Sequence, residues 1–86
     1  MGVHNEIREL LPEESIVFDN SSFDGSIIGY TDEGNVVYDF DKMLEEYVQD
    51  NGCSMEDAFE WITYNTMGAL PYAPEPKPIV MYRLEL

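Results

Sequence analysis

The chain has few of the residues that small proteins use for covalent links and for catalysis. Its 86 residues include one cysteine, Cys53, and one histidine, His4. A single cysteine excludes an internal disulfide and is typical of a reducing compartment, so we expect a cytoplasmic protein. A nucleophilic Cys53 would need a base, and His4 lies in an N-terminal stretch that we expect to be loosely held. We therefore interpret Cys53 as structural and predict no catalytic residue.

Positive charge is scarce as well. Four Lys and Arg stand against eighteen Asp and Glu, which gives a formal net charge of -14. Direct binding to nucleic acid is disfavoured, because each phosphate contact needs a cationic side chain that replaces counterions. The same sign disfavours binding to anionic membranes. We expect a cationic partner instead, such as a basic protein surface, including one that normally holds DNA or RNA.

Long apolar runs are also missing, and none reaches the roughly 20 residues of a membrane-spanning helix. The chain is nevertheless 44% hydrophobic, which is enough for folding despite the charge. Its length predicts one domain over residues 1–86, in which roughly 60–65% of the unfolded surface becomes buried.

The first half of the chain predicts a short helix and then strands. Apolar residues spaced three and four apart predict a helix or leader over residues 1–12, which Pro12 ends. Runs rich in β-branched and aromatic residues predict strands at 15–18, 26–31 and 36–40. The turn 32–35 separates the last two runs, and Gly34 can adopt the positive φ of a tight turn, so we predict a hairpin there.

Two helices are predicted in the second half. The first runs from an N-cap at Asp41 or Asp39 to about Asp50, where Asn51 and Gly52 permit a left-handed C-cap. The second begins after the N-cap Ser54 and ends before Pro71. Its apolar side chains are expected to hold the fold; they are Met55, Ala58, Phe59 and Ile62.

The C-terminal part predicts a crossing and a last strand. Alternating prolines predict an extended crossing over residues 73–78, and Ile79–Leu84 has strand composition. The predicted fold is therefore α+β. It has a roughly four-stranded, mostly antiparallel sheet in the order β-β-β-α-α-β, with the two main helices packed on one face.

Three segments carry a resemblance to a known group of proteins. They are Val37–Met43, Glu56–Ile62 and Tyr64–Tyr72, the last with the sequence Tyr-Asn-Thr-Met-Gly-Ala-Leu-Pro-Tyr. With them the chain, over residues 15–84, resembles a family of small acidic proteins from bacterial and phage genomes that has no assigned activity. The resemblance implies a shared fold and a phage or other mobile-element setting, and it transfers no catalytic residue. Small acidic proteins in such settings are often inhibitors of host systems, which favours that class.

Oxygen-bearing residues after the first strand run partly match a calcium loop. Asn20, Ser22 and Asp24 have the spacing of an EF-hand, but Thr31 stands where a bidentate Glu is needed, so a plain turn is favoured. Whether acidic residues at one end of the sheet hold an ion stays open; they are Asp19, Asp24, Asp32 and Glu33. We predict no cofactor and no metal site.

Candidates for partner binding lie on the two main helices. Trp61 and Tyr64 stand beside acidic residues, and aromatic anchors inside a charged rim are typical of binding hot spots. The alternative, that Trp61 is a core residue and the carboxylates only solvate the helices, is slightly favoured by the pattern alone. The candidates are Glu45, Glu46, Asp50, Glu56, Asp57, Glu60, Trp61 and Tyr64. Asn65, near a helix end, is expected to bond the backbone of the following loop.

The leading hypothesis is a non-enzymatic binding protein that docks on a basic protein surface. One form of it is a phage or mobile-element inhibitor that imitates nucleic-acid phosphates. The alternative is a self-associating structural module, in which the last strand or residues 64–72 pair with a second copy to form a homodimer.

Overall fold

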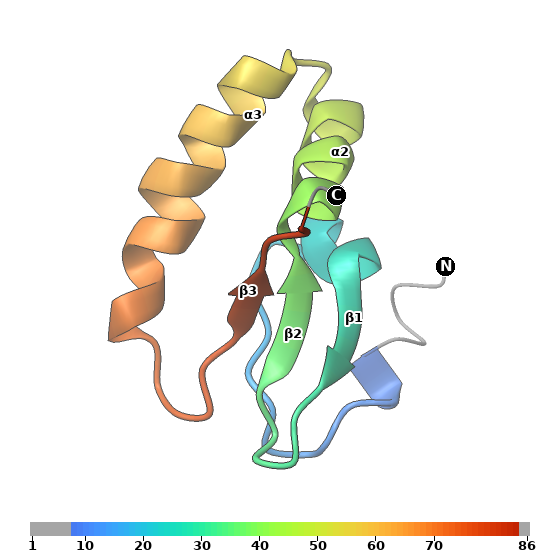
Figure 1. The fold of residues 1–86 in the computed structure, drawn as a ribbon, viewed down its shortest axis with the longest axis vertical. Coiled ribbons are helices and arrows are strands. Elements are labelled where there is room, and N and C mark those ends of the chain that lie inside the picture. The colour runs from blue at the N-terminus through green and yellow to red at the C-terminus, as the bar shows by residue number, and fades with distance from the viewer. Residues whose placement is uncertain (1–7, 85–86) are drawn as a thin grey trace.

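A computed structural model describes residues 8–84 and has an α+β fold (Figure 1). Its elements are the 3₁₀-helix η1 (Ser21–Ser26), the strands β1 (Ile27–Tyr30) and β2 (Val36–Asp39), the helices α2 (Phe40–Asn51) and α3 (Met55–Trp61), the π-helix η2 (Ile62–Met67), the 3₁₀-helix η3 (Leu70–Tyr72) and the strand β3 (Ile79–Met81).

The sheet has three strands in the order β1-β2-β3, so the prediction of four mostly antiparallel strands is wrong. β1 and β2 form the predicted antiparallel hairpin, with Gly34 at a φ of 89° in its turn. β3 instead runs parallel to β2, with Val37 opposite Ile79 and Asp39 opposite Met81. β3 is also shorter than predicted, because β2 ends at Asp39 and the chain beyond it is helical, which leaves no strand for residues 82–84 to pair with.

The run 15–18, predicted as a strand, is irregular. Its backbone groups at Phe18 are taken by side chains from elsewhere. The Phe18 N–H donates to the Tyr38 hydroxyl at 3.0 Å, and the Phe18 carbonyl accepts from the Arg8 guanidinium at 3.2 Å. These are groups that a ladder with a neighbouring strand would need, so the run stays outside the sheet.

Both predicted helix starts and the end of the first helix are confirmed, whereas the second helix was predicted to end before Pro71 and helical structure instead runs to Tyr72. An Asp39 carboxylate oxygen accepts from the Asp41 N–H at 3.1 Å and caps α2, which ends at Gly52 with a φ of 64°. The Ser54 hydroxyl accepts from the Asp57 N–H at 3.1 Å and caps α3. Helical structure then continues into η2 and η3 with a change of winding at Ile62.

The core joins one face of the sheet to η1, to α2 and to the start of η2. It consists of Phe23, Val36, Tyr38, Phe40, Met43 and Ile62. Of the apolar residues expected to hold the fold, Ala58 and Ile62 are buried, whereas Met55 and Phe59 are half-exposed. The cause is the position of α3, which packs mainly on α2 rather than over the sheet, contrary to the predicted packing of both helices on one face (Figure 1).

The ends of the described chain are fastened to this framework. The predicted helix over residues 1–12 lies largely outside the described residues, but Arg8 and Glu9 are helical and Leu11 packs against the core. In the proline-rich crossing, the Lys77 carbonyl accepts from the Asn35 side chain at 2.9 Å and Pro78 is buried. Between residues 8 and 84, no helix combines the length and apolar composition needed to cross a membrane.

Candidate functional site

A groove of about 560 Å³ lies between two walls that come from the first and the second half of the chain. We call its sides the helical wall and the irregular wall. The helical wall consists of Trp61, Asn65, Thr66, Ala69, Leu70, Tyr72 and Ala73. The irregular wall consists of Ile16, Val17, Phe18, Asp19 and Asn20. Phe23 also lines the groove, as do Pro74 and Pro78 from the crossing.

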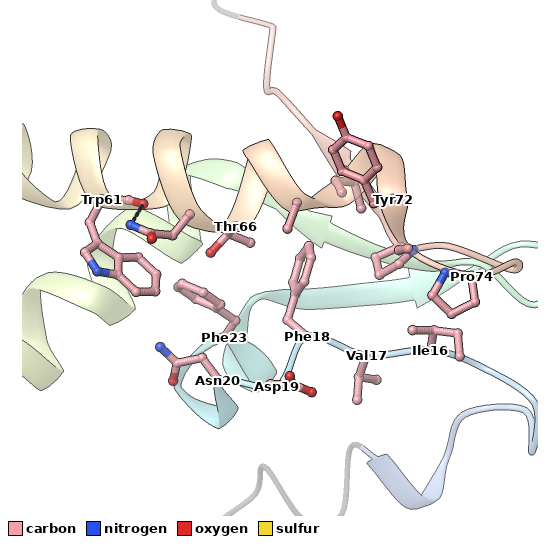
Figure 2. A pocket seen from close by; sticks show the side chains of 15 residues that line it. Ile16, Val17, Phe18, Asp19, Asn20, Phe23, Trp61, Thr66, Tyr72 and Pro74 are labelled. Atoms are coloured by element: carbon pink, nitrogen blue, oxygen red, sulfur yellow. Dashed lines mark hydrogen bonds between the residues drawn. The ribbon is translucent and has the colours of Figure 1, made fainter.

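Figure 2 shows how the groove is laid out. Trp61 lies at one end, and Pro74 and Ile16 lie at the other. The rings of Phe18 and Phe23 lie between the walls, with centroids 6.2 Å apart and nearly perpendicular planes. Most of the lining is therefore aliphatic or aromatic, as is usual for a site that binds apolar groups.

Asn65 and Thr66 of the helical wall lie in the π-helix η2. Wide π turns interrupt regular helical bonding and are frequent at functional sites. The Asn65 side-chain N–H donates to the Trp61 carbonyl at 2.9 Å, the dashed bond in Figure 2. Asn65 thus bonds backbone as expected, but the partner belongs to the preceding turn and not to the following loop.

Trp61 is held in place by a neighbouring ring. Its indole stacks on the Tyr47 ring of α2, with centroids 4.9 Å apart and an interplanar angle of 27°. The side chain is still 37% exposed. Trp61 is therefore neither a fully buried core residue nor a free surface residue, and it presents an oriented aromatic surface at one end of the groove.

Long-range side-chain bonds hold the irregular wall. Arg8 donates to both carboxylate oxygens of buried Asp24, at 2.6 and 2.9 Å, while it also reaches the Phe18 carbonyl. The hydrogen bond with Asp24 raises the pKa of Arg8 above its ordinary value. Burial raises the pKa of Tyr38 to about 12, so its hydroxyl stays neutral while it accepts from Phe18.

All four Lys and Arg side chains of the chain are already in ion pairs. The pairs are Arg8 with Asp24, Lys42 with Glu45, Lys77 with Glu75, and Arg83 with Asp39 and Asp41. Each cation is thus at least partly neutralised within the fold. The electrostatic potential at the surface of a molecule with a net charge of -14 is accordingly negative.

The predicted acidic candidates on α3 form an exposed face. Glu56 and Glu60 are exposed and four residues apart, so they lie one turn above the other. Tyr64 continues this stripe and is 80% exposed, but it does not line the groove. Asp57 and Trp61 lie on the adjacent stripe. The two aromatic candidates therefore serve different surfaces.

The candidates on α2 are partly engaged within the protein. Glu45 lies 3.7 Å from Lys42, and Asp50 accepts a hydrogen bond from the Ser22 hydroxyl of η1. Glu46 is half-buried. These carboxylates contribute to the negative surface potential, but the carboxylates of α3 are more accessible to a partner.

Among residues 8–84, no group of three or more His, Cys, Asp or Glu side chains is arranged so that it could hold a metal ion. Asp24 is committed to Arg8, and the Asn20 side-chain oxygen accepts from the Ser22 N–H to cap η1. The calcium-like spacing thus corresponds to a capped 3₁₀ turn.

The irregular wall was not among the predicted partner-binding residues, although Asp19 and Asn20 were considered as ion ligands. The only available signal was a short β-rich run placed directly before polar residues 19–22. Such a run usually enters a sheet, and nothing local distinguishes one that instead borders a groove. Comparisons of the chain with protein-family models, with curated proteins and with solved structures gave no match.

Proposed function

We propose that this protein is a small, non-enzymatic, acidic binding protein that docks on a basic protein surface in the cytoplasm. The observation that carries the proposal is the exposed acidic stripe of α3 beside a groove with an oriented tryptophan. Glu56 and Glu60 supply charge along the stripe, and Trp61 supplies an apolar anchor next to it. Binding hot spots combine these features.

The charge distribution supports the choice of partner. With every cation already paired, a second acidic molecule would be repelled, whereas a basic surface would be drawn in from a distance. Such steering depends on ionic strength, since charges more than about 8 Å apart are largely screened at physiological salt.

A pair of matched variants tests the proposal. In Glu56→Gln/Glu60→Gln the stripe loses two charges, while in Asp32→Asn/Glu33→Gln an exposed hairpin turn loses the same number. Immobilised protein would be incubated with a bacterial lysate at low and high salt. We expect the stripe variant to lose the salt-sensitive partner and the turn variant to keep it. Equal losses would indicate plain ion exchange, and no captured partner at low salt would refute the proposal.

Imitation of nucleic acid is the finer form of this proposal, together with a role as a phage or mobile-element inhibitor. It predicts that the captured protein binds DNA or RNA and that an oligonucleotide competes with this chain for it. A partner that binds both at once would exclude mimicry while leaving the docking function intact.

A second candidate function is self-association, and the open face of the sheet favours it. By the strand register, Ile79 and Met81 point away from the buried Tyr38 face, and they are 40% and 42% exposed. Ile28 of β1 is 54% exposed. A dimer through this face would strengthen with salt, because screening reduces the repulsion between two acidic copies. Light scattering at two salt concentrations measures the mass of the protein alone and separates the two functions. A mass that rises with salt indicates self-association, whereas binding to a basic partner is weakened by salt.

A further inference from the structure

The irregular wall offers the groove its backbone as well as its side chains. Five consecutive residues, 16–20, line the groove. Val17 and Phe18 point to opposite sides of the run in Figure 2, as neighbours in an extended chain do. Because alternate side chains turn away, all five can line the groove only if the main chain itself borders it.

Part of this main chain has no partner among the described residues. Ser15 and Phe18 use their backbone groups within the fold, through Pro12, Arg8 and Tyr38. Ile16 and Val17, between them, make no backbone hydrogen bond with any residue from 8 to 84. An extended run whose N–H and C=O groups have no partner within the described part of the chain is a surface to which a second extended chain can add by main-chain hydrogen bonds.

The size of the groove fits a short peptide segment. Trp61 and Leu70 are nine residues apart on the helical wall, which corresponds to a length of roughly 13 Å. An extended peptide advances by about 3.3 Å per residue, so about four residues would cover this length. The volume of about 560 Å³ lies within the usual range for a site that buries a small ligand.

The polar groups of the lining favour a ligand rich in donors. The Asn65 side chain uses its N–H toward Trp61, which leaves its oxygen as an acceptor. Asp19, on the irregular wall, is exposed and forms no ion pair with a described cation. With a net charge of -14 and no described cation to spare, the groove is complementary to lysine or arginine.

We propose that the groove binds an extended segment of about four residues that carries apolar side chains and at least one lysine or arginine. The segment pairs its main chain with Ile16 and Val17 and places an apolar side chain against Phe18 and Leu70. Its cation reaches past the main chain of the irregular wall to Asp19, whose carboxylate lies on the side opposite the Phe18 ring in Figure 2. This inference rests on the proposed function, because the segment belongs to the basic partner that the acidic stripe attracts.

Peptide titrations followed by NMR test the inference on the full chain. The probe is Ac-Leu-Lys-Leu-Lys-NH₂ at millimolar concentration, and the acidic control is Ac-Leu-Glu-Leu-Glu-NH₂. We expect the basic peptide to shift the Trp61 indole N–H and the amides of Ile16 and Val17, and the acidic peptide to leave them unchanged. A basic peptide with N-methylated backbone should bind more weakly, since it cannot complete the main-chain pairing.

Matched variants locate the cation. Asp19→Asn should lower the affinity for the basic peptide by roughly two- to fivefold, which is the effect of one exposed ion pair. Asp32→Asn should leave this affinity unchanged. Shifts centred on Ile79 and Met81, equal shifts with both peptides, or no shifts at millimolar peptide would overturn the inference. In each of those cases, lysate capture that still depends on Glu56 and Glu60 would leave the proposed function standing. If the protein also captures no partner from the lysate, both the inference and the proposed function are refuted.

Discussion

The two walls of the groove are built by different kinds of interaction. The helical wall follows a capped helix and is bonded largely within itself, with Ile62 as its buried anchor. The irregular wall has no ladder or helix of its own. It is held by side chains distant in sequence, namely Arg8 and Tyr38 at Phe18, and by the Ser15 hydroxyl, which donates to the Gly34 carbonyl at 2.9 Å.

This difference indicates where the groove can open. A segment held by a few tertiary bonds can detach with a smaller free-energy change than one that belongs to a cooperative helix. The irregular wall should therefore move first, and it carries the backbone groups of Ile16 and Val17 that have no hydrogen-bond partner among residues 8–84. Binding of an extended segment would add main-chain bonds to the weaker of the two walls.

The largest effect is expected where the helical wall meets the core. Ile62 is fully buried at the start of η2, so Ile62→Ala should lower the free energy of unfolding by roughly 2–4 kcal/mol through lost burial and a residual cavity. Urea unfolding followed by circular dichroism measures the change. Tyr64→Ala, on the exposed side of the same segment, is the control and should cost under about 0.5 kcal/mol. Equal effects would mean that Ile62 does not anchor this wall.

Removal of the ion pair between Arg8 and buried Asp24 tests how the irregular wall is held in place. Arg8→Met leaves the buried Asp24 carboxylate without its cation and also removes the donor to the Phe18 carbonyl. We expect a loss of about 2–3 kcal/mol, less than for a fully buried pair because the Arg8 side chain is 36% exposed. Urea unfolding gives the value.

The matched control is Arg83→Met, which removes the pairs with Asp39 and Asp41. The Arg83 side chain is 50% exposed, so this variant should be clearly less destabilised than Arg8→Met. Hydrogen exchange adds the spatial information. The Phe18 amide should exchange faster in Arg8→Met, while the amides of η2 stay protected, and uniform acceleration of both would contradict the proposed difference between the walls.

The Tyr38 hydroxyl provides a smaller change at the same wall. Tyr38→Phe removes the acceptor of the Phe18 N–H and should cost about 1–2 kcal/mol, with faster exchange of the Phe18 amide. Burial raises the pKa of Tyr38 from 10.0 to about 12. Because the folded-state pKa is the higher one, the stabilisation is complete below pH 10 and is lost as the pH rises toward 12.

The alkaline loss amounts to roughly 2–3 kcal/mol for a pKa difference of this size. Tyr38→Phe lacks the titrating group, so the stability advantage of the wild type should disappear and then reverse between pH 10 and pH 12, because the alkaline loss is larger than the about 1–2 kcal/mol that the substitution costs. Other tyrosines and lysines titrate in both proteins and cancel in the comparison. A difference that stays constant over this range would show that the Tyr38 hydroxyl is not buried in the fold.

The same contrast explains which parts of the fold could be predicted from the sequence. Local signals sufficed for the hairpin around Gly34, for the caps at Asp39 and Ser54 and for the C-cap at Gly52, since each depends on residues a few positions apart. The number of strands did not follow from local signals. Ile16–Phe18 has strand composition, yet bonds from Arg8 and Tyr38 keep it out of the sheet.

The site followed the same rule. Helical spacing predicted the exposed Glu56 and Glu60, and the sequence singled out Asn65 and Trp61 without placing them in a groove. The opposite wall lies more than forty residues away in the chain, so only the tertiary structure brings the two together. The parallel pairing of β3 was missed for a similar reason, because strand direction depends on where the crossing 73–78 returns to the sheet.

The smallest effect concerns the bond from Asn65 to the Trp61 carbonyl. Asn65→Ala should change the free energy of unfolding by no more than about 0.5 kcal/mol, since the better helix propensity of Ala offsets the lost exposed bond. The expected response is structural: without this bond the wide turn relaxes toward regular helix and the indole leaves its place on Tyr47. The chain has one tryptophan, so a red-shifted emission and stronger acrylamide quenching report that movement directly. Thr63→Ala, exposed in the same turn, should leave the emission unchanged. If Asn65→Ala also leaves it unchanged, backbone bonding alone shapes the helical wall, and the contrast with the side-chain-held irregular wall is sharper than we propose.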